Sequence, residues 1–166
     1  MTLHATIHNR DFSAQPIRPI NFRIDKLTWS IYGGPDEAFL SAGSTTDRLL
    51  EYSSLLRCPI TISEQFSIPA WWGYINKITF YFEKINFVID LEDLYNRVNV
   101  KYSFLSPDGK LSEYLETGFS EDAFSKSEFG TREIVLSRRN RDDEFAVNLR
   151  DTFLELYAFP RTILSP

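Results

Sequence analysis

The chain has 166 residues, of which 43% are hydrophobic and 25% are charged, and this composition is typical of a soluble globular protein with one or two small domains. Its net charge of -5 excludes an overall positive field that would attract nucleic acid or an anionic membrane. The one cysteine, Cys58, excludes an internal disulfide. No apolar stretch approaches the roughly 18 residues that cross a bilayer, so we expect no membrane span, and we expect no secretion signal.

Residues 1–20 form the first predicted segment. They include both histidines, His4 and His8, and show no sustained apolar period, so we expect an extended arm that has no core of its own. Such an arm can become ordered on a neighbouring subunit. The apolar residues available for that contact are Leu3, Ile7, Phe12, Ile17 and Ile20.

Residues 21–91 are predicted to form a β-rich barrel or sandwich with one short inserted helix. Apolar residues alternate from Phe22 to Ile31 with one change of phase, which indicates a bulged strand, and Gly33-Gly34-Pro35 then favours a turn into a returning strand. A short helix is expected over residues 45–57 because apolar side chains recur there at helical spacing. The strongest alternation of the chain lies between Trp71 and Leu91 and predicts two further strands.

Residues 92–166 are predicted to form an α+β module. In chain order the expected elements are a strand from Val98 to Phe104, a turn at Ser106-Pro107-Asp108-Gly109, a capped turn or short helix over 120–129, a strand at 134–136 and a final helix. The final helix is expected to begin after Asn140 or Asp142 and to end before Pro160. The predicted fold class is therefore α+β, mostly antiparallel β, with the C-terminal helix packed on a second small sheet.

Candidate catalytic side chains are few. Both histidines lie in the predicted arm, four residues apart, where a fixed catalytic geometry is not expected. Arg57 could favour a reactive thiolate at Cys58, but a small buried residue at the start of a strand explains the same cysteine.

Charged clusters in the second half have both a functional and a structural interpretation. Asp90, Glu92 and Asp93 could bind a divalent cation or act as paired acids, but a solvated turn explains them and no glycine-containing ligand loop surrounds them. Acidic residues alternate with four arginines, which predicts a salt-bridged surface; these are Arg132, Arg138, Arg139 and Arg141. We therefore expect no enzymatic activity, no cofactor, no metal and no nucleic-acid partner.

Trp71-Trp72 is the most conspicuous pair in the sequence. Successive residues of a strand point to opposite faces, so one indole is expected in the core and the other towards solvent or a partner. The outward indole could stack on a sugar or anchor a protein interface. A third interpretation is that neighbouring loops cover both rings.

Several strings, taken in their order and spacing over residues 22–160, resemble a family of phage tail and baseplate hub proteins. The strings are Trp29 through Gly33-Gly34-Pro35, Leu55-Leu56-Arg57-Cys58-Pro59-Ile60, Trp71-Trp72-Gly73-Tyr74-Ile75, Leu91 through Tyr102, Ser127 through Glu133, and Arg150 through Leu154. The resemblance implies a β-rich hub module that forms a ring around the tail axis and links the tail tube to the tip. Members are usually longer, so a reduced version or a separate module is expected.

Individual residues fit that implied role. Gly73 would let a backbone or a ring approach closely, and Asn96-Arg97 offers a turn with a cation that can brace the neighbouring strand. Gly130 would allow a tight entry to a central strand. The candidate interface residues are Trp71, Trp72, Tyr74, Tyr81, Asn96 and Arg97.

Three functional hypotheses follow from the sequence. The first is a non-enzymatic structural virion protein of the phage tail, assembled in the host cytoplasm, whose partners are further copies of itself in a ring such as a trimer and other tail or baseplate proteins. The second is a carbohydrate-binding module that uses Trp71 or Trp72, with a host-surface glycan as ligand. The third, which the sequence favours least, is a small hydrolase using Asp90 and Asp93.

Overall fold

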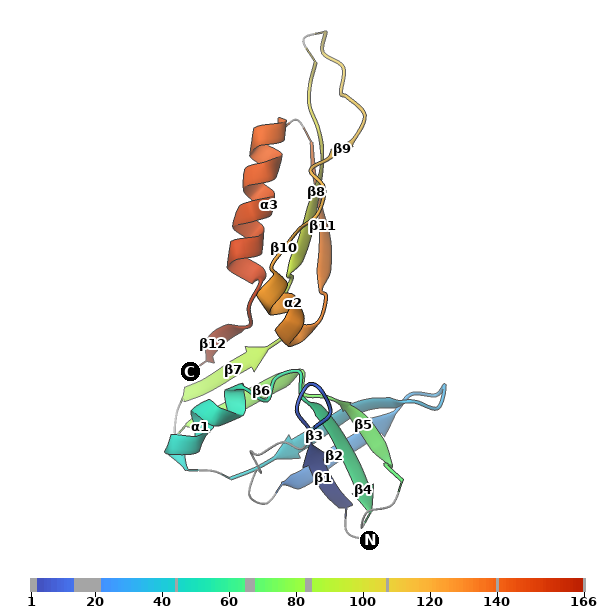
Figure 1. Cartoon of the computed structure of the whole chain (residues 1–166), viewed down its shortest axis with the longest axis vertical. Helices are drawn as coiled ribbons and strands as arrows, with labels where there is room; N and C mark the ends of the chain where they lie inside the picture. Colours follow the sequence, from blue (N-terminus) through green and yellow to red (C-terminus); the bar gives the residue numbers. More distant parts are fainter. Residues whose placement is uncertain are drawn as a thin grey trace. The chain divides into compact units, whose positions relative to one another are not determined.

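The computed structural model describes residues 3–13, 22–43, 45–64, 68–82, 85–106, 108–139 and 141–165. Within these ranges it contains twelve strands and three helices, in sheets that do not close into a barrel, so the α+β prediction is confirmed and the barrel alternative is not (Figure 1). The helices are α1 (Thr46–Ser53), α2 (Ala123–Phe129) and α3 (Asp143–Tyr157). The strands are β1 (Leu3–Ile7), β2 (Arg23–Trp29), β3 (Pro35–Ser41), β4 (Pro59–Glu64), β5 (Trp71–Tyr74), β6 (Lys77–Phe82), β7 (Ile85–Asp90), β8 (Arg97–Ser103), β9 (Leu115–Glu116), β10 (Ser120–Glu121), β11 (Glu133–Arg139) and β12 (Arg161–Ser165).

The chain divides into two compact units. The first unit comprises Met1–Ile89 with Ile163–Pro166, and the second comprises Asp90–Thr162. The division falls at Asp90, close to the break that the sequence suggested near Glu92. Each unit has its own buried cluster of apolar side chains.

The core of the first unit lies beneath the three-stranded antiparallel sheet β1-β4-β5. Ile7, Ile60, Ile62 and Trp71 are buried there, where they contact the α1 residue Tyr52. The expectation of an arm without a core was wrong for β1, because Leu3, Ala5 and Ile7 alternate towards this core and β4 supplies their partner strand. The arm residues Pro16, Ile17, Pro19 and Ile20 lie outside the described residues.

A second sheet of the first unit is the antiparallel hairpin β2-β3. Its register shifts between Ile24 and Lys26, where the change of phase predicted a bulge, and shifts a second time between Leu27 and Trp29. Gly33 turns the chain with φ of 86°, a conformation that favours glycine. The remaining strands β12, β7 and β6 form a third sheet in that order.

Helix α1 is shorter than the sequence predicted, and a non-helical segment joins it to β4. α1 ends at Ser53, four residues before the predicted end at Arg57. Arg57 has φ of 68°, a left-handed conformation that ends any helix and is uncommon for a residue with a Cβ. β4 then begins at Pro59, where the Cys58-Pro59 step favours extended backbone.

The second unit is a small sheet covered by α3. β8 is central, with β10 and β9 antiparallel to it and β11 parallel to it. Figure 1 shows α3 lying along β8 and β11, and Val100, Tyr102 and Ala146 are buried between them with Leu136 and Leu149 against them. The predicted packing of the C-terminal helix on a second sheet is therefore confirmed.

The N-terminus of α3 begins where the sequence indicated. The side chain of Asp142 accepts a hydrogen bond of 2.8 Å from the main-chain N–H of Phe145, which satisfies one of the free donors in the first turn. The other candidate cap, Asn140, lies outside the described residues. The helix ends at Tyr157, before Pro160.

Candidate functional site

The two adjacent tryptophans of β5 face opposite sides of the sheet. Trp71 is 5% exposed and Trp72 is 57% exposed, so one indole is in the core and the other faces solvent, as alternation predicted. The Trp71 ring lies over Gly73, where an added Cβ would be 2.5 Å from a ring carbon. This is the close approach expected of Gly73.

The outer face of the sheet β1-β4-β5 carries two rows of side chains. The first row consists of Thr6, Thr61 and Trp72, which are register partners. In the second row, His8 donates its main-chain N–H to Pro59, and Pro59 is the register partner of Tyr74. We call these six residues the outer face, of which Pro59 is buried. The ring nitrogen Nε2 of His8 lies 3.2 Å from the Thr61 hydroxyl, so the two rows are joined.

Arg57 lies at one end of the outer face. Its guanidinium is stacked on the Tyr74 ring, with 3.9 Å between the guanidinium carbon and the ring centroid, a cation–π arrangement. The main-chain N–H of Arg57 donates a 2.7 Å hydrogen bond to Ile75. The left-handed backbone of Arg57 is thereby held so that the guanidinium covers the tyrosine.

The turn between β2 and β3 exposes two large apolar side chains. Ile31 is 92% exposed and Tyr32 is 93% exposed. The turn is ordered by main-chain hydrogen bonds between Ser30 and Gly34 (2.8 Å) and between Gly33 and Ser30 (3.0 Å). The sequence analysis assigned Ile31 to the end of a strand and did not predict that Ile31 and Tyr32 would be exposed on a turn. The signal that could have indicated this is the position of the apolar pair directly before Gly33-Gly34.

Tyr81, on β6, is the most exposed of the residues that the sequence proposed as interface contacts, at 79%. It lies near the end of the strand and is followed by Phe82, which is also exposed. Trp72, Tyr74 and Tyr81 are therefore accessible to a partner, whereas Trp71 is not. The reversal Glu83-Lys84 that follows lies outside the described residues.

Asn96 is a structural residue and not an interface contact, because it is fully buried. Its side-chain nitrogen donates to the Ser125 hydroxyl (3.2 Å) and to the Gly130 carbonyl (2.8 Å), and its side-chain oxygen accepts from the Arg132 N–H (2.8 Å). The amide thus ties the start of β8 to α2 and to the segment before β11. The sequence predicted a turn at Asn96-Arg97. The burial of Asn96 was not predicted because it depends on contacts with residues far away in the sequence.

Arg97 braces the neighbouring strand, as its position suggested. Its guanidinium is 2.7 Å from the Glu133 carboxylate on β11 and 3.6 Å from the Glu121 carboxylate on β10. It also lies over the Phe119 ring at 4.0 Å. The side chain is about one third exposed, so Arg97 is mainly engaged within its own unit.

Cys58 and Asp90, two of the residues weighed for catalysis, both have structural explanations. Cys58 is buried in the core of the first unit, which is the simpler of its two interpretations. Asp90 accepts a 3.2 Å hydrogen bond from the main-chain N–H of Glu92, the geometry of an ordinary turn. Within the described ranges, no group of three His, Cys, Asp or Glu side chains is placed to hold a metal ion.

The arginines of the final third contact main-chain and aromatic groups. Arg132 donates to the Leu91 carbonyl (2.8 Å), and Arg139 donates to the Tyr114 hydroxyl (2.8 Å). Arg141 lies over the Phe145 ring at 4.9 Å. These contacts add hydrogen bonds and ring stacking to this surface, and its salt-bridged character stays a prediction.

Ionisable groups of the second unit are perturbed by structural hydrogen bonds. A hydrogen bond from Lys126 lowers the pKa of the Glu121 carboxyl, and one from Asn99 lowers the pKa of Glu116. The hydrogen bond from Tyr102 to Asp143 (2.7 Å) raises the pKa of the tyrosine. Each group has a partner that explains the shift, so these shifts indicate structural pairing.

Comparison with protein-family models, curated proteins and solved structures found no match to this chain. None of the helices in the described part of the chain is long and apolar enough to span a membrane.

Proposed function

We propose that the chain is a structural virion protein of a phage tail or baseplate hub, which assembles through protein–protein interfaces into a ring that links the tail tube to the tail tip. The observation that carries this proposal is the number of large apolar side chains that both units leave open to solvent, led by Ile31 and Tyr32 at 92% and 93% exposure. Isolated soluble domains rarely leave such side chains grouped and uncovered.

The turn between β2 and β3 has the features of an interface anchor. Ile31 and Tyr32 lie on a hydrogen-bonded turn, so little conformational entropy is lost when a partner covers them. Tyrosine is among the residues that dominate binding energies at protein interfaces. Trp29 and Phe39, each 51% exposed on the two strands of the same hairpin, extend the apolar surface.

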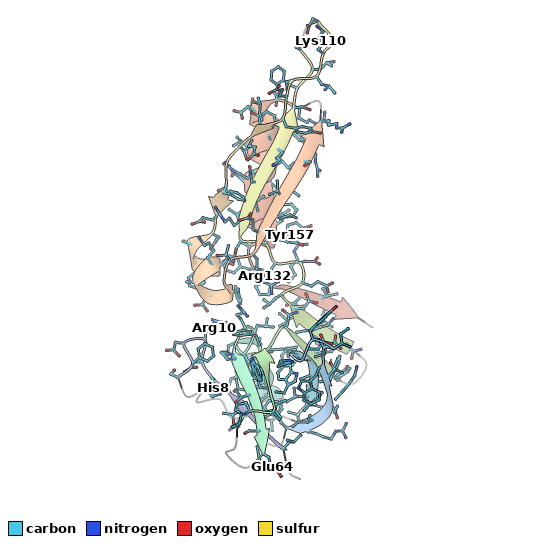
Figure 2. The ribbon with its side chains drawn as sticks, turned by 90° about the vertical axis from the view of Figure 1, so that its right-hand side faces the viewer. His8, Arg10, Glu64, Lys110, Arg132 and Tyr157 are labelled. Atoms are coloured by element: carbon cyan, nitrogen blue, oxygen red, sulfur yellow. The ribbon has the colours of Figure 1, made fainter. Side chains whose placement is uncertain are left out.

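The second unit offers a comparable surface at the connection between β8 and β9, which extends beyond the end of α3 (Figure 1). Lys110 is at its tip (Figure 2). The exposed large apolar residues on and beside this connection are Phe104, Leu105, Leu111, Tyr114 and Leu115. Two separate apolar projections on one chain suit a heterologous contact, which closes into a ring when the rotation between copies allows it.

The assignment to a phage tail is supported by the resemblance of the sequence strings over residues 22–160. On this proposal the partners are further copies of the chain, in a ring such as a trimer, and other tail or baseplate proteins. The protein works by binding, without a cofactor, and it reaches the virion after assembly in the host cytoplasm.

The test combines light scattering with the isolation of particles. At about 50 µM, well above the dissociation constant of a stable assembly, we expect the purified chain to elute as a defined oligomer on size exclusion with light scattering. The double variant Ile31→Ser, Tyr32→Ser should shift towards monomer, and the matched control Ile31→Leu, Tyr32→Phe should retain the oligomer. Wild-type protein that stays monomeric and never co-purifies with tail particles would overturn the proposal.

A further inference from the structure

We propose that the outer face of the sheet β1-β4-β5 binds an acidic saccharide, with one sugar ring stacked on Trp72 and an anionic group of the saccharide bound by Arg57. This site is additional to the proposed assembly role and does not depend on it. The residues concerned come from three hydrogen-bonded strands, from His8 directly after β1 and from Arg57 two residues before β4.

The outer face is built on three hydrogen-bonded strands. Adjacent strands lie about 4.8 Å apart and alternate residues of one strand about 6.6 Å apart, so the rows Thr6–Thr61–Trp72 and His8–Pro59–Tyr74 define a surface about 10 Å wide. Beneath it, Trp71 fills the core against Gly73. The packing of Trp71 thus anchors the strand that carries Trp72 on its other face.

Trp72 and its neighbours provide the chemistry that a sugar ring requires. A pyranose has a face of C–H groups, which packs on the negative face of an indole, and a rim of hydroxyls, which need hydrogen-bond partners. The indole is 57% exposed. The hydroxyls of Thr6 and Thr61 share its row, and the His8 imidazole lies 3.2 Å from the Thr61 hydroxyl.

Arg57 makes the site selective for an anion. Its guanidinium lies on the Tyr74 ring, and among the described residues it has no carboxylate partner. No residue of the two rows is acidic. A planar guanidinium that is already oriented and lacks a counter-ion is suited to a carboxylate, sulfate or phosphate group.

A second cation lies at the same end of the sheet. The Arg10 guanidinium donates to the Leu56 carbonyl at 3.1 Å and to the Ser54 carbonyl at 3.4 Å, which places it beside the residue that precedes Arg57. Figure 2 shows His8 and Arg10 towards this end of the strands and Glu64 at the other end. Two guanidinium groups therefore lie at this end of the sheet, in a chain whose net charge is -5.

The backbone of Arg57 supports the same interpretation. A φ of 68° is strained for arginine, and glycine or asparagine would adopt it more easily. The left-handed conformation places the guanidinium over Tyr74, on the same face as Trp72. Arginine thus occupies, at a conformational cost, the position that presents a cation to the outer face.

The experiment is a glycan array with the full chain, which includes uronic-acid, sialic-acid, sulfated and phosphorylated glycans with their neutral analogues, followed by calorimetry on the strongest acidic glycan. We compare wild type with Trp72→Ala, with Arg57→Gln and with the matched control Tyr81→Ala, which removes an exposed aromatic ring from a different strand. Thermal unfolding shows whether each variant is folded. Polyglutamate serves as an acidic ligand that has no sugar ring.

We expect Trp72→Ala to lower the affinity about tenfold or more, and Arg57→Gln to reduce the affinity for the acidic glycan to that for its neutral analogue, with Tyr81→Ala unchanged. The preference for the acidic glycan should weaken as salt is raised. The variant Ile31→Ser, Tyr32→Ser should bind glycan as wild type does, whatever its oligomeric state. The proposal is overturned if no acidic glycan binds at about 1 mM, if polyglutamate binds equally well, or if Tyr81→Ala weakens binding as much as Trp72→Ala.

Discussion

Replacement of Asn96 by alanine should destabilise the second unit more than any other single polar substitution discussed above. The asparagine is fully buried, and its amide makes hydrogen bonds of 3.2, 2.8 and 2.8 Å with Ser125, Gly130 and Arg132. Three hydrogen bonds at about 1 kcal/mol each give about 3 kcal/mol, and the buried groups left without a partner add to the loss. We therefore expect the free energy of unfolding to fall by about 3–5 kcal/mol.

Two spectroscopic probes separate the two units in this measurement. All three tryptophans, Trp29, Trp71 and Trp72, lie in the first unit with the short helix α1, whereas most of the helical residues, those of α2 and α3, lie in the second. Urea unfolding followed by circular dichroism at the helical band should therefore show the loss, and tryptophan fluorescence reports the first unit. Asn148→Ala, which changes an exposed asparagine on α3, is the control and should shift the free energy by less than about 0.5 kcal/mol. A circular dichroism transition of Asn96→Ala that matches the control would refute the reasoning.

Three further substitutions or conditions test the description of the fold. Gly73→Ala places a Cβ 2.5 Å from the Trp71 ring. The free energy of unfolding of the first unit, followed by tryptophan fluorescence in urea, should therefore fall by about 1–3 kcal/mol. Asp142→Ala removes the side-chain cap of α3, so the free energy of unfolding followed by circular dichroism should fall by about 1 kcal/mol. An unchanged unfolding midpoint would contradict a stabilising role for this cap. The pKa of Glu121 in the folded state is lowered, chiefly by the hydrogen bond from Lys126. The ionised carboxylate therefore stabilises the fold at pH values above its unfolded-state pKa, and this stabilisation is lost as the pH falls through its folded-state pKa. The pH dependence of the unfolding midpoint below about pH 4.5 should therefore be weaker in Glu121→Gln than in wild type.

Alternation and turn chemistry account for most of what could be predicted. The opposite directions of Trp71 and Trp72 follow from the two-residue period of a strand, because the side chains on one face of β5 meet the core. The register shift of β2 between Ile24 and Lys26 follows from the change of phase between Phe22 and Ile31, whereas the second shift, between Leu27 and Trp29, was not predicted. These features depend on residues close together in the sequence, so the sequence alone was sufficient.

Features that depend on distant residues were not predictable in the same way. β11 is parallel to β8 and β1 pairs with β4, and neither pairing has a local turn that would specify it. The burial of Asn96 likewise requires Ser125, Gly130 and Arg132, which lie about thirty residues further along the chain. Asn96 therefore looked like a turn residue in the sequence.

The exposed side chains differ in kind between the two proposed binding surfaces. Ile31 and Tyr32 are large and apolar on a tight turn, so covering them removes apolar area from water, which favours a protein partner. Trp72 instead lies beside hydroxyls, an imidazole and an arginine without a carboxylate partner among the described residues, and a purely apolar partner would leave these polar groups unsatisfied. A protein partner for the turn and a hydroxylated, anionic ligand for the outer face can thus bind one chain without competing for the same residues.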